Sequence, residues 1–341
     1  MNKFPYRFSV IVPTYNRLDE IRELLLSLEK QTLPKDNFEV LIVDDGSTDA
    51  TETFINEMIE EDKLNLFFYK QDHKGPGPAR NTGMEQARGE YYIFVDSDCI
   101  ADENWLKAYD EALTEKVAGF GGPDKVRSDF SPLQKSIDYS MTSFITTGGI
   151  RGSSKKKISK YYPRSFNMGV HADVVKEIGG FGTLRHGQDI EFTHRIRSRG
   201  KTIKVMDAIV FHKRRTSLWR FFKQVYNWGV ARINLYKIDK GMLEPIHFFP
   251  FLGTSFIIGF LICLAIWPSV LWPVLLAGVG MLLLMAIHGI FKYKDIRVFF
   301  FIPFVVPIQI LGYGFGFGGA LIRRVIFSGR EQAGFVKNYY K

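Results

Sequence analysis

Cysteine is scarce in this sequence, which limits how the chain can be held together. The 341 residues include two cysteines, Cys99 in the charge-rich first part and Cys263 in an apolar run. Neither a disulfide framework nor a cysteine-rich metal site follows from this pair. Apolar residues make up 46% of the chain, so a hydrophobic core is the source of stability that we expect.

Charged residues are missing from two long stretches. No Asp, Glu, Lys or Arg occurs in the 46 residues from Ile246 to Phe291 or in the 25 residues from Val298 to Ile322. The first stretch is long enough for two membrane-spanning helices of about 20 residues each, which predicts a hairpin. Pro303, Pro307 and closely spaced glycines predict that the second is broken, tilted or re-entrant. These stretches exclude a simple soluble enzyme, and we expect two or three membrane spans.

The charge itself is distributed unevenly. The net charge is +9, yet residues 1–194 carry 24 positive and 31 negative charges, whereas residues 195–240 carry 13 positive and 2 negative. The first seven residues lack the apolar segment of a secretory signal. By the positive-inside rule we expect a multi-pass protein of the cell membrane whose first 245 residues are cytoplasmic. The basic tail at 328–341 obeys that rule only if one apolar segment does not cross fully.

Residues 217–236 interleave aromatic and cationic side chains. Such a helix is typical of a membrane interface, and its position directly before the apolar stretch favours lipid headgroups over nucleic acid as the partner. The sequence therefore predicts a first domain at 1–215, an amphipathic membrane-interface segment at 216–245, a transmembrane region at 246–327 and a basic tail at 328–341.

Short β-rich runs alternate with amphipathic helical patterns in the first hundred residues. The β-rich runs cover residues 8–12, 38–43, 64–69 and 91–95, and the helical patterns cover 18–30, 50–61 and 79–88. This alternation predicts an α/β fold, a parallel sheet with helices on both faces. In such sheets a ligand binds beyond the carboxyl ends of the strands.

Polar residues follow three of these strands. They are Pro13-Thr14-Tyr15-Asn16, Asp44-Asp45-Gly46-Ser47 and Asp96-Ser97-Asp98. Each alone is explained as a turn or a helix cap, but their joint placement predicts a site. The glycines of residues 75–78 do not have the spacing of a dinucleotide fingerprint, and we expect a helix to begin at Pro78.

The residue types indicate a nucleotide diphosphate as the ligand. Asp96 and Asp98 at one strand end can hold a divalent cation whose other positions are filled by phosphate oxygens. Asp45 can accept the N3–H of a uracil while Tyr15 stacks on its ring. Arg80 can neutralise phosphate charge.

Two further motifs, Asn81-x-Gly83 and Ala87-x-Gly89, precede Asp96-Ser97-Asp98. With them the chain resembles glycosyltransferase family 2, which has the GT-A nucleotide-sugar fold, over residues 8–215. The resemblance implies an inverting transfer from a nucleotide diphospho-sugar, usually with Mg²⁺ or Mn²⁺. It also implies substrate-binding roles for Pro13, Tyr15, Asp45, Arg80 and Asp96.

The resemblance extends to the acceptor side. Residues 163–169, which include the candidate substrate-binding residue Asn167, and residues 179–181 match the family. The family usually has Glu-Asp where this chain has Gln188-Asp189, and its Asp is the general base. Asp189 is therefore the candidate base for a sugar hydroxyl, with a helix N-cap as its alternative role.

His212 follows a predicted strand at 208–211. The resemblance makes it a third candidate metal ligand beside Asp96 and Asp98, and an unrelated surface histidine is the alternative. Residues 224–228 are similar to the Gln-x-x-Arg-Trp motif of processive polysaccharide synthases but lack its Arg, which favours transfer of a single sugar.

We therefore expect a membrane-anchored enzyme that transfers one sugar, from a UDP-sugar, to a hydroxyl of a lipid-linked saccharide at the cytoplasmic membrane face. Such an enzyme would act in cell-surface glycan assembly and would be similar to those that extend polyprenyl-diphosphate saccharides. One alternative is a polyprenyl-phosphate glycosyl synthase, whose acceptor needs no base. The other is a catalytically silent membrane scaffold.

Overall fold

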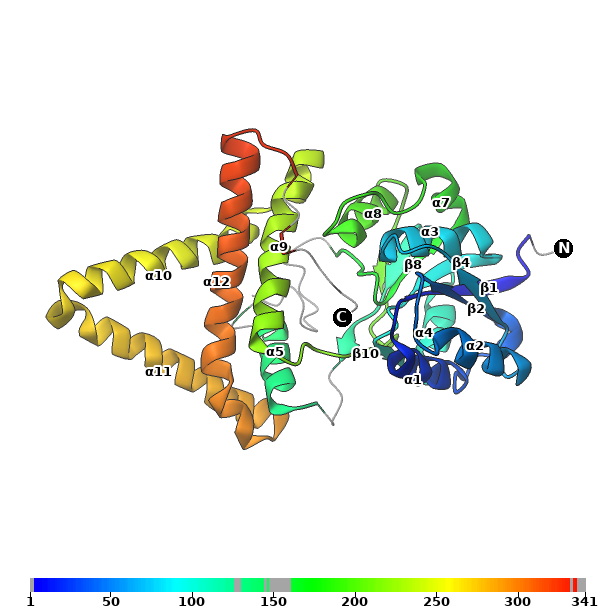
Figure 1. The fold of residues 1–341 in the computed structure, drawn as a ribbon, viewed down its shortest axis with the longest axis horizontal. Helices are drawn as coiled ribbons and strands as arrows, with labels where there is room; N and C mark the ends of the chain where they lie inside the picture. Colours follow the sequence, from blue (N-terminus) through cyan, green and yellow to red (C-terminus); the bar gives the residue numbers. More distant parts are fainter. Residues whose placement is uncertain (1–2, 126–129, 144–145, 147–160, 332–333, 336–341) are drawn as a thin grey trace.

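The structure, a computed structural model, describes residues 3–125, 130–143, 146, 161–331 and 334–335. An α/β unit holds the N-terminal part of the chain and a helical unit the C-terminal part (Figure 1). Helix α9 (Leu218–Ile238) and helix α5 (Pro132–Thr142) lie between the two.

Among the described residues, seven strands form the main sheet in the order β3-β2-β1-β4-β8-β6-β9. Strands β1 to β4 are parallel, which confirms the predicted alternation, and β8 runs antiparallel to both of its neighbours. The strands are β1 (Tyr6–Thr14), β2 (Phe38–Asp44), β3 (Leu66–Lys70), β4 (Gly89–Phe94), β6 (Gly119–Gly121), β8 (Met168–His171) and β9 (Thr202–Lys204).

Helices cover both faces of this sheet because its strands are apolar on both sides. In β1, Val10 and Val12 belong to one buried cluster, whereas Ile11 belongs to another on the opposite face. The first cluster includes residues of α1 (Leu18–Leu28), α2 (Thr51–Glu60) and α4 (Trp105–Ala112). The second includes residues of α3 (Pro76–Gln86), α7 (Ala172–Ile178) and α8 (Gln188–Arg197).

The start of α3 differs from the prediction. This helix begins at Pro76 rather than Pro78. A proline in the first turn costs nothing because its missing N–H would have no partner there. Gly75 precedes it with φ of 95°, a conformation that glycine adopts without strain.

A second sheet of three short strands lies beside the first. It consists of β5 (Cys99–Ala101), β10 (Val210–His212) and β7 (Asp124–Lys125). Strand β10 runs antiparallel to β5 with His212 opposite Cys99. This pairing brings residue 212 to the end of the Asp96-Ser97-Asp98 segment.

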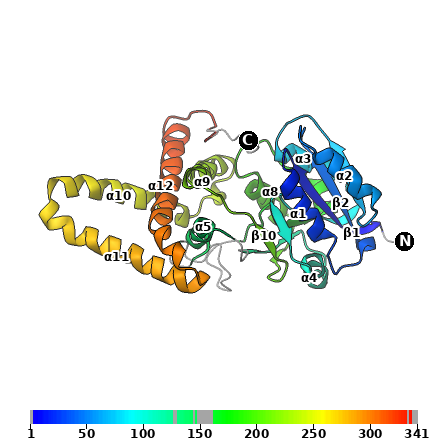
Figure 2. The ribbon, with the colours of Figure 1, turned by 60° about the horizontal axis from the view of Figure 1, so that its bottom comes forward.

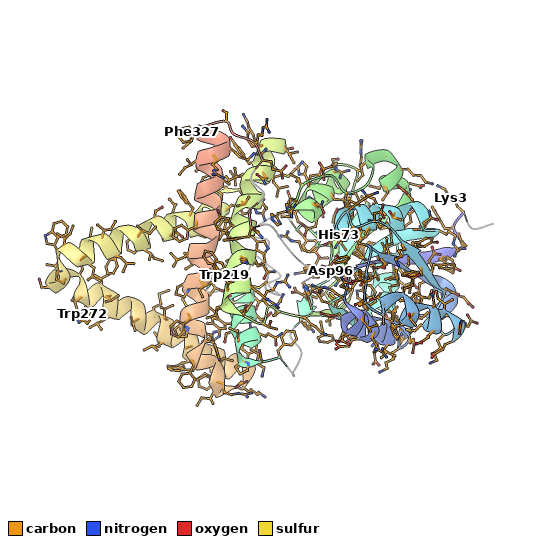
Figure 3. The ribbon with its side chains drawn as sticks, viewed as in Figure 1. Lys3, His73, Asp96, Trp219, Trp272 and Phe327 are labelled. Atoms are coloured by element: carbon orange, nitrogen blue, oxygen red, sulfur yellow. The ribbon has the colours of Figure 1, made fainter. Side chains whose placement is uncertain are left out.

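Within the described residues, three helices are long and apolar enough to cross a membrane. Helices α10 (Phe249–Ile266) and α11 (Pro268–Tyr293) form the predicted hairpin, which projects away from the α/β unit (Figures 1 and 2). Trp272 lies near its tip (Figure 3). The hairpin exposes large apolar side chains such as Leu284 and Phe291, as expected of a surface that faces lipid.

The third apolar segment is one continuous helix, so of the three expected forms (broken, tilted or re-entrant) the broken helix is wrong. Helix α12 (Ile302–Ala320) is continuous through Pro307 and passes into a π-helical turn at Leu321–Ile326. Its glycines allow close packing of helices: a Cβ at Gly316 would lie 2.0 Å from the carbonyl oxygen of Tyr226 in α9. Small residues at such crossings compensate for the poor helix propensity of glycine.

A buried ion-pair network joins the two units. The guanidinium of Arg214, which follows β10, lies 2.6 Å from Asp124 Oδ2 in β7 and 2.7 Å from Asp138 Oδ1 in α5. The Tyr293 hydroxyl of α11 donates to Asp138 Oδ2 at 2.6 Å. These contacts hold α5 and α11 against the α/β unit.

Candidate active site

The segments after β1 and β2 meet at the carboxyl edge of the sheet, as predicted. Ser47 Oγ accepts from the backbone N–H of Asn16 at 2.7 Å, and Asn16 Oδ1 accepts from the N–H of Thr48 at 2.7 Å. Pro13 is buried within β1, opposite Val43. Pro13 therefore supports this edge, and the Tyr15 ring lies at it.

Asp45 is buried and holds the loop that leads into α3. Its carboxylate accepts from the backbone N–H groups of Lys74 and Gly75 at 2.9 and 2.7 Å. His73 Nδ1 lies 2.8 Å from Asp45 Oδ2, and the His73 ring stacks on Tyr15 with 4.2 Å between centroids. Tyr15 and Asp45, which the sequence assigns to one base-binding site, thus flank a single imidazole.

Arg80 and Asp96 form a direct pair. Arg80 is buried in α3, and its Nη2 donates to Asp96 Oδ1 after β4. The next residue, Asn81, accepts from the Phe181 N–H at 2.7 Å and donates to the Phe181 carbonyl at 3.0 Å. The motif that carries Arg80 therefore also fixes the turn at 179–181.

Asp98 lies between Arg17 and His212. Arg17 Nη1 is 3.0 Å from Asp98 Oδ2, and His212 Nε2 is 3.1 Å from Asp98 Oδ1. Burial alone would raise the pKa of Asp98, but the charges of His212 and Arg17 hold that pKa below its ordinary value. The buried carboxylate is therefore ionised.

The residues around Asp98 fit a divalent cation. Ligand atoms of Asp98, Cys99 and His212 lie within 4.8 Å of one another. His212 Nδ1 is buried and, within the described residues, has no hydrogen-bond partner. Carboxylate oxygen with imidazole nitrogen is a donor set that Mn²⁺ accepts. Asp96, two residues earlier, is partly exposed on the same segment.

Asp189 lies at the start of α8, but it is not the N-cap. That position belongs to Gly187, which has φ of 84°, and the Asp189 carboxylate accepts from the N–H of Ile190 at 3.0 Å. Arg164 Nη1 is 3.4 Å from Asp189 Oδ2. The carboxylate is only partly buried, so it is open to a proton from a substrate.

Gln188 joins the start of α8 to the start of α3. Its Nε2 donates to the Gly182 carbonyl at 3.1 Å, and a Cβ at Gly77 would lie 2.6 Å from its Oε1. The amide thus gives a reason for Gln where the family usually has Glu, since a carboxylate could not donate to a carbonyl. The contact also places Asp189 on the same side of the sheet as the loop held by Asp45.

Asn167 is fully buried, and its side chain does not line this edge. Its Oδ1 accepts from Trp105 Nε1 at 2.8 Å and from the Tyr109 hydroxyl, and its Nδ2 donates to the Ala208 carbonyl at 2.8 Å. Asn167 therefore positions β8 and the segment before β10. A substrate-binding role for its side chain is not supported.

Arg17 and His73 are absent from the sequence predictions. Arg17 pairs with Asp98 across 81 residues of chain, and His73 lies in a loop between β3 and α3. No spacing pattern connects either residue to its partner. Figure 3 shows His73 and Asp96 on the side of the α/β unit that faces α9, where Trp219 lies.

Comparison with known proteins gives consistent results. The chain is 29% identical over 259 residues to Glycosyltransferase AglE of Haloferax volcanii, which covers 74% of this chain and 81% of AglE. It is 28% identical over 257 residues to dolichyl N-acetyl-alpha-D-glucosaminyl phosphate 3-beta-D-2,3-diacetamido-2,3-dideoxy-beta-D-glucuronosyltransferase of Methanococcus voltae, which covers 71% of this chain and 77% of that protein.

The fold also has a solved counterpart. Mannosyltransferase PcManGT from Pyrobaculum calidifontis, in complex with GDP-Man and Mn²⁺, superposes with a TM-score of 0.64 and 17% identity, covering 89% of this chain and 87% of that one. At this identity the likeness concerns the GT-A fold alone. The profile described as Glycosyl transferase family 2 matches residues 9–179, half of the chain, which include Tyr15, Asp45 and Asp96. The chain therefore belongs to glycosyltransferase family 2.

Proposed function

We propose that this glycosyltransferase transfers a single sugar, with inversion, from a UDP-sugar to a hydroxyl of a lipid-linked saccharide at the cytoplasmic face of the membrane. The observation that carries the proposal is the meeting of Tyr15, Asp45 and the Arg80–Asp96 pair at one sheet edge, with Asp189 on the same side. Three apolar helices then follow.

The donor half of the proposal rests on chemistry at that edge. A uracil between Tyr15 and Asp45 would stack on a phenol ring and donate its N3–H to a carboxylate. Arg80, already buried, loses little freedom when its guanidinium also binds phosphate oxygens. This arrangement favours a pyrimidine nucleotide with a diphosphate.

The chemical step needs a base because a sugar hydroxyl is a poor nucleophile until its proton is removed. Asp189 is partly exposed and would accept that proton as the hydroxyl oxygen attacks the anomeric carbon. The bond from that carbon to the diphosphate breaks on the opposite side, which gives inversion. Arg80 stabilises charge on the departing diphosphate.

A divalent cation fits beside the groups that take part in this transfer. When bound by Asp98 and His212, with Asp96 nearby, Mg²⁺ or Mn²⁺ would supply positive charge to the diphosphate. Arg17, 3.0 Å from the other carboxylate oxygen of Asp98, holds this side chain in place.

The acceptor half rests on the helical unit and on the relatives. Helix α9 lies beside the α/β unit and packs on α12, so a lipid-borne acceptor would approach along it. The name of the Methanococcus voltae relative includes a dolichyl-linked acetamido sugar phosphate. We extend this acceptor class to the present chain, with residues 1–245 on the cytoplasmic side and a role in cell-surface glycan assembly.

Two other functions make different predictions. A polyprenyl-phosphate glycosyl synthase would transfer sugar to a lipid phosphate without any need for Asp189. A catalytically silent scaffold would neither hydrolyse nor transfer from any nucleotide sugar. The carboxylates of Asp96 and Asp98, each paired with an arginine, disfavour the scaffold.

A panel of UDP-, GDP- and dTDP-sugars, each with and without Mn²⁺, tests the donor proposal. Purified full-length protein in detergent should gain thermal stability with UDP-sugars and Mn²⁺ above all others. The stabilising donor is then incubated with polyprenyl-diphosphate saccharides and with polyprenyl phosphate. Stabilisation by GDP-sugars alone would reject the uridine assignment, and transfer to polyprenyl phosphate alone would favour the synthase.

A further inference from the structure

The C-terminal half of α9 packs against the start of α8. A Cβ at Gly187 would lie 3.2 Å from Leu235 Cδ1 and 3.4 Å from the Cβ of Ala231. Leu235 also shares a buried cluster with Ile190 of α8. Asp239, just after α9, pairs with His194 of α8 at 2.9 Å. The helix that leads to the membrane segments therefore adjoins the helix that carries Asp189.

Arg232 lies in this seam, between Ala231 and Leu235 of α9. It is partly buried, and its charge interacts with those of Arg164 and Asp189. Burial lowers the pKa of Arg232, and the neighbouring charge of Arg164 lowers it further. Two guanidinium groups thus belong to this seam, that of Arg164 beside Asp189 and that of Arg232 on the helix packed against Gly187.

Around Asp189 the seam has more positive charge than this one carboxylate balances. Arg164 is paired with Asp189 at 3.4 Å, and in the described ranges no carboxylate lies within ion-pair distance of Arg232. The turn of α9 that leads to Arg232 packs on Tyr313 of α12, since a Cβ at Gly229 would lie 2.2 Å from the Tyr313 carbonyl oxygen, and the Arg232 side chain interacts with the Tyr313 hydroxyl. That hydroxyl is buried and makes no hydrogen bond of normal geometry with any described residue. A cation and an unused hydroxyl donor therefore face the same place.

We propose that Arg164, Arg232 and Tyr313 bind the phosphate group that links the acceptor sugar to its lipid. Guanidinium groups bind phosphate oxygens in pairs of parallel hydrogen bonds, and a hydroxyl adds a third donor. An anion between the two arginines removes the repulsion between them. The inference rests on the proposed function and names its acceptor as a phosphate-bearing lipid.

The same site would make the availability of the general base Asp189 depend on acceptor binding. A phosphate that engages Arg164 competes with the 3.4 Å contact between this residue and Asp189. The Asp189 carboxylate is then available to the hydroxyl of the sugar next to that phosphate. Arg164 and Arg232 are therefore positioning residues for the transfer, and Asp189 remains the group that takes the proton.

Binding of farnesyl diphosphate to the full-length protein in detergent tests the site. Saturating UDP and a chelator keep farnesyl diphosphate out of the donor site. Calorimetry then measures the affinity of the protein for farnesyl diphosphate and, for comparison, for farnesol and for inorganic diphosphate. Farnesyl diphosphate should bind at least tenfold more tightly than farnesol. Arg232→Gln should lower the affinity for farnesyl diphosphate at least tenfold. Arg232→Lys should lower it less because it keeps the positive charge.

The matched control is Lys237→Gln, which removes one exposed charge from the same helix and should leave the affinity unchanged. The UDP affinity of Arg232→Gln is measured as well, to show that the donor site of this variant is folded. Equal binding of farnesol, or unchanged affinity in Arg232→Gln, would overturn the proposal. Equal binding of inorganic diphosphate would reject the lipid source. None of these results depends on which donor stabilises the protein, so failure of the proposed function is seen separately.

Discussion

The imidazole of His73 stacks on the phenol ring of Tyr15, with 4.2 Å between centroids and 27° between planes. Its Nδ1 also lies 2.8 Å from Asp45 Oδ2. Stacking on Tyr15 and an N–H near Asp45 are the two contacts that we propose for uracil. His73 therefore competes with the nucleotide base for the same two partners.

His73→Ala should bind UDP about 2- to 10-fold more tightly, because no ring has to be displaced and an aromatic pair is worth about 0.5–1.5 kcal/mol. Calorimetric titration of UDP checks this. Asp72→Asn is the control, since it changes an exposed neighbour in the same loop. Weaker UDP binding by His73→Ala would show that the imidazole helps to bind the uracil instead of competing with it.

Asp98→Asn should abolish transfer and remove the part of nucleotide affinity that depends on Mn²⁺, because the diphosphate would lose the positive charge held beside it. Asp96→Asn should also abolish transfer, and His212→Ala should weaken metal dependence less. Donor affinity and turnover are measured with and without chelator. Full wild-type turnover in chelator is the result that would reject the metal site.

Arg214→Met should lower the thermal stability of the protein strongly, because it removes the buried guanidinium that pairs with the carboxylates of Asp124 and Asp138. Breaking one partner of a buried pair typically costs about 3–5 kcal/mol. Thermal unfolding in detergent measures the change. Lys213→Met is the control, because its pair with Glu23 is partly exposed and should matter little. Equal melting temperatures in the two variants would contradict the network.

Local patterns were enough to predict the sheet and its polar edge. The alternation of strands and helices in residues 8–95 predicts four parallel strands. Tyr15, Asp45 and Asp96 each follow one of these strands, and they gather at one edge because the carboxyl ends of parallel strands lie on the same side of the sheet. Only the family resemblance predicted that His212 joins Asp98, because no spacing pattern shows the β5–β10 register through which the two meet. The partner of α12 was not predictable: this helix stays continuous because α9 accommodates its glycines.

Asn167 shows a second limit. Its residue type and motif suggested contact with substrate, but the buried partners of its amide come from α4 and from the segment before β10. A motif can therefore mark a position that shapes the site without touching the ligand. Burial, which only the assembled core determines, separates the two cases.

Asp189→Asn separates the two enzymatic functions. If the acceptor is a sugar hydroxyl, loss of the proton acceptor should lower turnover about 10²- to 10⁴-fold while UDP affinity stays nearly unchanged. Single-turnover rates and UDP titrations of the same preparation measure both. The variant should fold, because Gly187 occupies the N-cap and an amide oxygen can still accept from the Ile190 N–H.

If the acceptor is instead a lipid phosphate, it is already ionised at neutral pH and no proton has to leave it. Asp189→Asn should then cost far less turnover with polyprenyl phosphate than with a lipid-linked saccharide. Arg164→Gln provides the matched comparison, since it removes the partner at 3.4 Å but keeps the carboxylate. It should raise KM for a phosphate-bearing acceptor while kcat falls less than in Asp189→Asn. Near wild-type turnover of Asp189→Asn with a saccharide acceptor would therefore reject Asp189 as the base, whatever the donor.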